Sequence, residues 1–115
     1  MFNRRQSGQT KFGSSFNQST VIQVWQKGGL VPGQDPAYVR QDSCGAYIYW
    51  ADYGNTSSQF GWEIDHIFPV SKGGQDDLQN LQPLQWENNR HKGDSYPHLA
   101  CKIGHPSLLR GLLSL

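Results

Sequence analysis

The stretch GWEIDHIFPVSKGG, residues 61–74, places a carboxylate and an imidazole side by side at the end of a short apolar run. Trp62 and Ile64 alternate with acidic residues, a pattern that predicts a strand over 62–67. A proline and a Gly-Gly pair follow and end that strand in a turn. The question that this stretch raises is why two ionisable side chains stand together at the strand end.

Neighbouring residues of an ideal strand point to opposite faces of a sheet. Asp65 and His66 can therefore serve one site only if the strand ends or twists where they stand. Pro69 and Gly73-Gly74 make such an end plausible.

Two elements are expected after this turn. Residues 77–85 predict a compact turn and a short strand, with Leu78, Leu81 and Leu84 as core residues. Residues 85–93, QWENNRHKG, predict a helix of two to three turns that Gly93 ends.

Upstream, the sequence predicts one helix and one strand. VIQVWQKG, residues 21–28, has apolar residues at helical spacing, with Ser19 or Thr20 as the cap and Gly28 and Gly29 as the stop. AYIYW, residues 46–50, is aromatic and β-branched and predicts a strand.

These elements predict a small single α+β domain. We divide the chain into a flexible amino-terminal segment (1–20), a supporting helix and strand (21–60), the part that carries the chemistry (61–94), and a carboxy-terminal tail without an assigned role (95–115).

Composition limits the function classes. The 115 residues are 36% apolar and 17% charged, which suits one small globular domain and not a disordered chain. No apolar run approaches the ~20 residues of a membrane span, so no membrane partner is expected. No signal peptide is visible, which predicts a cytoplasmic protein of bacterial or phage type.

The net charge of +1 is a weak argument for a nucleic-acid partner, and the distribution of charge matters more. Arg4, Arg5 and Lys11 make the amino terminus basic, and Arg90 and Lys92 form a second basic cluster.

The two cysteines, Cys44 and Cys101, lie 57 positions apart. Without an export signal we expect reduced thiols, as is usual in a cytoplasm, and a disulfide between them is the alternative.

The segment 61–94 offers the groups that a phosphodiester hydrolase needs. His66 can take a proton from water at neutral pH. Asp65 and the amide oxygens of Asn80, Asn88 and Asn89 can hold a divalent cation that offsets charge in the transition state.

These residues resemble the HNH endonucleases, which carry the ββα-metal (His-Me finger) motif. The resemblance rests on Asp65-His66, on Asn80 fourteen residues later within NLQPL, and on Asn89 followed by Lys92 in the pattern N-x-x-K. It covers residues 61–94 closely and 38–60 loosely, and the phrases WEIDHIFPVSKGG, NLQPL and NNRHKGD resemble one stand-alone branch. Because Asn89 stands at the third position of the pattern, this chain resembles the H-N-N variant.

Carried over residue by residue, the resemblance implies that His66 is the general base and that Asn80 fixes the loop and orients the base. It implies metal ligation by Asp65 and Asn89. A carboxylate and an amide oxygen suit Mg²⁺, or Mn²⁺, better than zinc.

Asn88 and Glu63 lie next to the expected ligands and offer alternative roles. Helical spacing places Asn89 and Lys92 on one face of the helix and favours Asn89 over Asn88 as the ligand. Glu63 shares a strand face with Asp65, so it either tunes the site without touching the metal or is an exposed strand residue.

Many relatives also hold a structural zinc on two C-x-x-C pairs. Here Cys44 alone is left of the first pair, with Gln41 at its mate's position, and Gln85 and Asn88 stand at the second. The sequence therefore predicts no structural zinc. The string His98, Cys101, His105 has three candidate ligands but no fourth.

The resemblance implies a metal-dependent DNA endonuclease that leaves 5′-phosphate and 3′-hydroxyl ends. Double-stranded DNA is the expected partner, and the expected nucleic-acid contacts are Arg90, Lys92 and Lys72. One site cuts one strand, so a monomer would nick and a homodimer could break both strands. The alternatives are a non-cleaving DNA-binding or partner-recruiting module, and a nuclease toxin that acts on RNA or on another cell's DNA.

Overall fold

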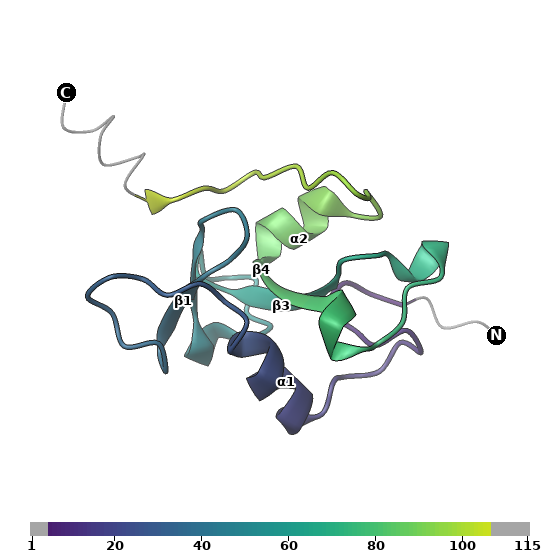
Figure 1. The fold of residues 1–115 in the computed structure, drawn as a ribbon, viewed down its shortest axis with the longest axis horizontal. Coiled ribbons are helices and arrows are strands. Elements are labelled where there is room, and N and C mark those ends of the chain that lie inside the picture. Colours follow the sequence, from purple (N-terminus) through teal and green to yellow (C-terminus); the bar gives the residue numbers. More distant parts are fainter. Residues whose placement is uncertain (1–4, 107–115) are drawn as a thin grey trace.

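The structure is a computed structural model that describes residues 5–106. Within this range the chain forms two α-helices and two small antiparallel sheets, a mixed α/β arrangement (Figure 1). Three short 3₁₀ helices connect them, at Trp50–Asp52, Val70–Lys72 and Leu78–Asn80.

The first helix, α1 (Gln18–Trp25), begins and ends three residues earlier than the predicted 21–28. Its cap is Asn17 and not Ser19 or Thr20. The Asn17 side-chain oxygen accepts the Thr20 N–H at 2.8 Å, which satisfies one of the free donors of the first turn.

The first sheet pairs β1 (Val39–Gln41) with β2 (Tyr47–Tyr49). β2 lies within the predicted strand 46–50, but β1 was not predicted, because three residues are too few to show an alternating pattern. Trp50 leaves the strand and begins a 3₁₀ turn.

The second sheet pairs β3 (Trp62–His66) with β4 (Leu81–Gln85), and Asp65 stands opposite Gln82 in this register. Both strands agree with the predictions to within a residue. All five residues of β3 are buried. The chain then passes directly into the second helix, α2 (Trp86–Lys92), as predicted.

The Gly73-Gly74 turn after β3 requires glycine at both positions. Gly73 has a φ of +104°, which side-chain-bearing residues rarely adopt. A Cβ on Gly74 would stand 1.8 Å from the Phe68 carbonyl oxygen. The turn therefore folds the chain tightly back on the end of β3.

The core lies between α1 and the β3–β4 sheet. Trp62 is fully buried, and its ring lies 5.2 Å from that of Trp25 between centroids. Leu81 and Leu84 are buried as predicted, but Leu78 is 39% exposed because it falls in a 3₁₀ helix before β4. The buried cluster consists of Val21, Val24, Trp25, Ile48, Trp62, Ile64 and Leu81.

The amino-terminal residues from Arg5 onward form turns that lie against the loop after β3 (Figure 1). The Lys11 N–H donates to the Asp76 carboxylate at 3.0 Å. Gly8, with a φ of +81°, approaches β3 so closely that a Cβ there would lie 3.3 Å from the Glu63 Cβ. This segment is therefore bonded to the part of the chain that carries the chemistry.

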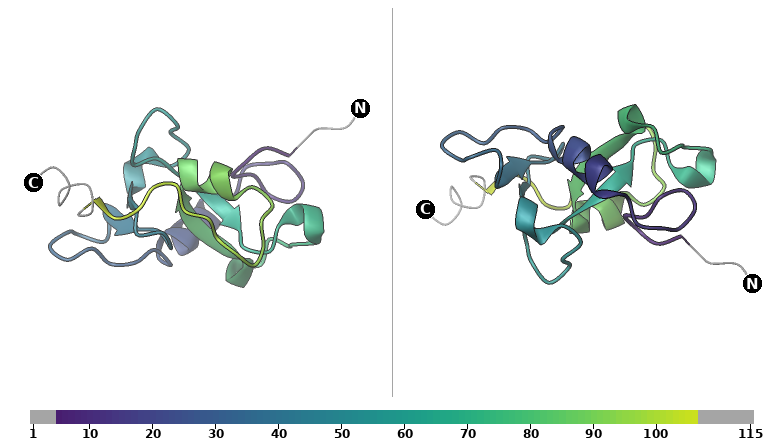
Figure 2. Two further views of the ribbon diagram at one scale, coloured as in Figure 1. Left: turned by 90° about the horizontal axis from the view of Figure 1, so that it is seen from above. Right: turned by 90° about the horizontal axis from the view of Figure 1, so that it is seen from below.

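Residues after α2 run back across that helix, as the view from above shows (Figure 2, left). Asn88 holds them, because its amide oxygen accepts the N–H groups of Lys102 and Ile103 at 2.8 and 2.7 Å. The leucine-rich end of the tail, residues 107–115, lies outside the described residues.

Cys44 and Cys101 form a disulfide, so the prediction of reduced thiols was wrong. The bridge depends on the tail returning over α2, a tertiary feature that spacing alone does not reveal. Disulfides persist mainly in oxidising compartments, so this bridge is an argument against the predicted cytoplasmic location. Within residues 5–106, no helix is both long and apolar enough to cross a membrane.

Candidate active site

The end of β3 and the face of α2 meet at a small cavity of about 60 Å³, room for a few water molecules or a hydrated ion. Asp65, His66 and Asn89 all line it, although they come from two elements. Because β3 ends at His66, both neighbours reach the same cavity. The other polar or small residues that line it include Arg5, Ser7 and Gly8.

His66 is buried, with 4% of its surface exposed. Its Nε2 atom lies 2.7 Å from Asp76 Oδ1, and the Phe16 ring packs at 6.0 Å between centroids. The Ile67 N–H donates to the Asn80 carbonyl at 2.8 Å and holds the backbone directly after the histidine. The imidazole is therefore fixed on several sides and has little freedom to rotate.

Asp65 is also buried and is held by two donors. Lys92 Nζ lies 3.2 Å from its Oδ1, and Gln82 Nε2 donates to its Oδ2 at 2.9 Å. Burial raises the pKa of the Asp65 carboxyl, and the Gln82 hydrogen bond and the Lys92 charge partly oppose that rise. Each carboxylate oxygen has a second lone pair, so both donors leave room for a further ligand.

Asn89 lies in the cavity with its amide oriented by Glu63. Its Nδ2 donates to Glu63 Oε1 at 3.0 Å, which leaves the amide oxygen as the free acceptor. The other Glu63 oxygen accepts from Arg90 at 3.0 Å, and this contact raises the pKa of the Arg90 guanidinium. Glu63 is 6% exposed, so it is not an exposed strand residue.

Residues 54–95 match the family model described as HNH endonuclease. This segment is similar to the HNH endonucleases. HNH proteins are in general endonucleases that act on nucleic acid, and they typically use divalent metals. Searches of curated proteins and of solved structures found no significant match to the chain.

Asn80, the middle residue of the HNH pattern, clamps the loop after β3. Its side-chain oxygen accepts the Phe68 N–H at 2.8 Å, and its Nδ2 donates to the carbonyls of Phe68 and Gln75 at 3.1 and 2.9 Å. These three bonds fix the two ends of the loop to each other. They are contacts of the kind expected of a residue that fixes the loop.

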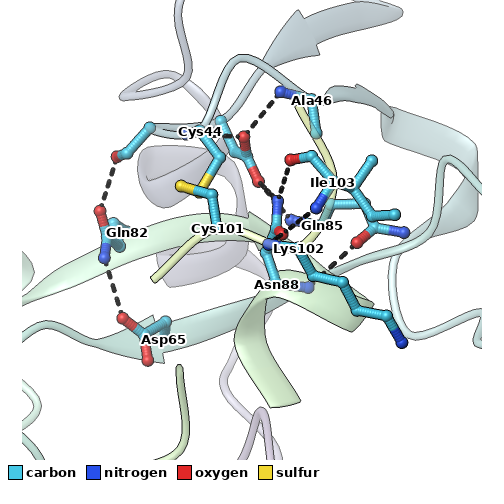
Figure 3. Close-up of a disulfide and its surroundings, with 11 residues drawn as sticks. Cys44, Ala46, Asp65, Gln82, Gln85, Asn88, Cys101, Lys102 and Ile103 are labelled. Carbon is cyan, nitrogen blue, oxygen red and sulfur yellow. Dashed lines mark hydrogen bonds between the residues drawn. A yellow bond between two sulfur atoms is a disulfide. The ribbon is translucent and has the colours of Figure 1, made fainter. Parts of the chain in front are cut away.

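Asn88 lies outside the cavity of the HNH domain, unlike Asn89. It is fully buried and donates to Asp42 at 3.0 Å and to the Ile103 carbonyl at 2.9 Å (Figure 3). The two neighbouring amides of α2 thus serve two different networks. Asn89 contacts the strand side, and Asn88 contacts the disulfide side.

The three basic residues expected to contact nucleic acid lie in different environments. Lys72 is exposed in the turn after β3, and Arg90 is half-exposed beside Glu63. Lys92 is buried, with its ammonium 3.0 Å from the His66 carbonyl oxygen and close to Asp65. The structure thus assigns Lys92 a place inside the domain, where it ties α2 to the end of β3, and not on a surface that could meet a phosphate.

A polar network surrounds Cys44, Gln85 and Asn88, three of the positions that the sequence comparison aligned with a zinc site. Asp42 accepts hydrogen bonds from the Cys44 and Ala46 N–H groups and from the Gln85 N–H, each at 2.9 Å (Figure 3). This network joins the turn at 42–46 to the start of α2, and the disulfide joins the same turn to the tail at Cys101. Both cysteine sulfurs are bonded to each other, so neither offers a thiolate to a metal.

A hydrogen-bonded relay connects the same turn to the cavity. The Ser43 hydroxyl donates to Gln82 Oε1 at 2.8 Å, which directs the Gln82 amide nitrogen at Asp65 (Figure 3). Among residues 5–106, no group of three or more His, Cys, Asp or Glu side chains could hold a metal by itself. A cation in this domain would therefore depend on few protein ligands.

Two functional candidates were missed by sequence reasoning. No role was predicted for Asp76, and Arg5 was predicted only as part of the basic amino terminus, yet Asp76 contacts His66 and Arg5 lines the cavity. Arg5 also lies outside the matched segment 54–95. No local pattern could have found it, because it meets the cavity across some sixty residues of chain.

Proposed function

We propose that this protein is a metal-dependent DNA endonuclease, and that β3, β4 and α2 form its ββα-metal finger. The observation that carries the proposal is that Asp65, His66 and Asn89 line one cavity. The HNH match to residues 54–95 supports the reaction class, phosphodiester hydrolysis.

The donor set of the cavity fits a hard divalent cation. Asp65 and the free oxygen of Asn89 would hold it, with water and a substrate phosphate as the remaining ligands, and Mg²⁺ tolerates so few protein ligands. Mg²⁺ is the metal proposed, with Mn²⁺ as a substitute. When bound, the cation supplies positive charge that offsets the charge developing on the phosphate and its leaving oxygen.

The residues of the chain perform the remaining steps. His66 takes a proton from the water that attacks phosphorus, and its fixed imidazole keeps the accepting nitrogen in place. Lys92 and Gln82 hold the Asp65 carboxylate in position, and both favour its ionised form against the effect of burial on its pKa. Glu63 orients the Asn89 amide so that its oxygen, and not its nitrogen, is available.

The deciding experiment incubates supercoiled plasmid with the protein in Mg²⁺, in Mn²⁺ and in EDTA. We expect nicked circles with either metal and none in EDTA, and strong loss of nicking in Asp65→Ala, which removes a proposed ligand. Asp77→Ala is the matched control, because Asp77 is an exposed carboxylate outside the cavity. Linear product without a nicked intermediate would indicate a homodimer that cuts both strands together.

Other outcomes would contradict the proposal in defined ways. Retarded migration of DNA without cleavage would support a non-cleaving module. Cleavage of RNA but not of DNA in a parallel reaction would support an RNA-directed toxin.

Arg5 is proposed to bind a phosphate of the substrate. It lines the cavity, and its Nη1 is held by the carbonyls of Gln6 and Gln9 at 3.2 Å each, which leaves its other N–H groups available. Loss of a charged hydrogen bond costs about 1.5–3 kcal/mol, so Arg5→Ala should lower kcat/KM for plasmid cleavage by about 10- to 100-fold.

The control for Arg5→Ala is Lys102→Ala, which removes one positive charge that pairs with Glu87 outside the cavity. It should leave kcat/KM nearly unchanged at physiological salt. Equal losses in both variants would show that only net charge matters and would remove Arg5 from the site.

A further inference from the structure

Asp76 contacts the proposed base but is no part of the H-N-N pattern. Its Oδ1 lies 2.7 Å from His66 Nε2, and its side chain is 29% exposed while that of His66 is 3% exposed. The carboxylate thus stands between the buried imidazole and solvent.

Asp76 is itself held from two sides. The Lys11 N–H donates to both of its oxygens, at 3.0 and 3.4 Å. The residue before it is clamped by Asn80, whose Nδ2 donates to the Gln75 carbonyl. These contacts with the amino-terminal segment and with the loop hold the Asp76 carboxylate in a fixed position beside His66.

The chemistry of this contact decides where the imidazole proton lies. An ionised carboxylate only accepts hydrogen bonds, so the hydrogen between the two groups belongs to His66 Nε2. A neutral imidazole with hydrogen on Nε2 has its free lone pair on Nδ1. Nδ1 is then the atom that can accept a proton from water.

We propose that Asp76 is a positioning residue that fixes the Nε2–H tautomer of His66 and so makes Nδ1 the proton-accepting atom. This inference rests on the proposed function for its kinetic consequence. The tautomer of His66 can be measured whether or not the protein cleaves DNA.

The first test measures the tautomer directly. Long-range ¹H–¹⁵N correlation spectra of uniformly ¹⁵N-labelled protein are recorded well above the ordinary histidine pKa of about 6.5, so that neutral rings are observed. We expect the His66 ring to show a protonated Nε2 and an unprotonated Nδ1. His66→Gln assigns the signals by their loss, and a protonated Nδ1 in the wild-type protein would overturn the proposal.

The variants then test whether Asp76 is the cause. Asp76→Ala should give a mixture of the two His66 tautomers, and Asp77→Ala, the exposed neighbour, should leave the spectrum unchanged. Asp76→Asn should keep much of the Nε2–H form, because an amide oxygen still accepts, and it keeps an acceptor for Lys11 as well. An unchanged tautomer in both Asp76 variants would exclude the positioning role.

The second test is kinetic. Asp76→Ala should lower kcat for plasmid cleavage by about 10- to 100-fold, as for other groups that orient an active-site histidine, with KM nearly unchanged. Asp76→Asn should recover part of the loss. A rise in KM with kcat unchanged would contradict the inference. If the wild-type protein cleaves no DNA, the proposed function fails. The tautomer measurement still decides whether Asp76 positions His66.

Discussion

Replacement of His66 by alanine is expected to lower the rate of plasmid nicking by about 100- to 10,000-fold, the range over which a positioned general base accelerates proton transfer. His66 is the only group proposed to accept the proton of the attacking water. Lys92 is engaged with Asp65 and the His66 carbonyl, and Asp65 itself is held by two donors. The measurement is the initial rate of nicked-circle formation in Mg²⁺.

His91→Ala is the matched control for this variant. His91 is an exposed histidine of the same domain, and it lies outside the cavity. It should nick DNA at close to the wild-type rate. Equal rates for His66→Ala and the wild-type protein would refute the mechanism.

The buried position of His66 requires a check on folding, because alanine leaves a void beside Phe16. His66→Gln fills more of that space and should be equally inactive. Calorimetric titration with Mn²⁺ should still detect binding in both variants, since Asp65 and Asn89 are intact. Inactive protein that no longer binds Mn²⁺ would point to a damaged site and not to a missing base.

Removal of the disulfide is expected to have the largest effect on stability. The Cys44–Cys101 bridge closes a loop with a sequence separation of 57 residues. The chain-entropy relation for such a loop gives about 4 kcal/mol at 25 °C. The Cys44→Ser, Cys101→Ser double variant should lose free energy of unfolding on this scale, measured by urea denaturation monitored through tryptophan fluorescence.

The matched control is the addition of a reductant. Reductant should lower the free energy of unfolding of the wild-type protein to that of the double variant and should leave the double variant unchanged. Two titratable thiols in wild-type protein denatured without reductant would show that the bridge does not form.

The effect of the disulfide on the site should be indirect. Without the bridge, the tail is still held to α2 by the Asn88 bonds to Lys102 and Ile103, and the cavity side of the helix keeps the Asn89–Glu63 contact. Cleavage activity below the unfolding transition should therefore fall less than stability does.

Much of the local structure was predictable because its causes lie within a few residues. Alternation of apolar and acidic residues determines β3, and the run that ends at Gly93 determines α2. The predictions were wrong at the ends of helices and missed very short strands. The cap of α1 was misplaced by competing polar residues, and β1 was too short to recognise.

The sequence by itself determined the resemblance to HNH endonucleases, the adjacency of Asp65 and His66, and the glycine turn that ends their strand. Only the tertiary structure decided that Asp76 contacts His66, that Arg5 lines the cavity, that Lys92 is buried and that the cysteines are bonded. The reason is physical. Hydrogen-bonded elements and turns are set by neighbours along the chain, whereas a contact such as Lys11 to Asp76 joins residues 65 positions apart and exists only once the core has packed.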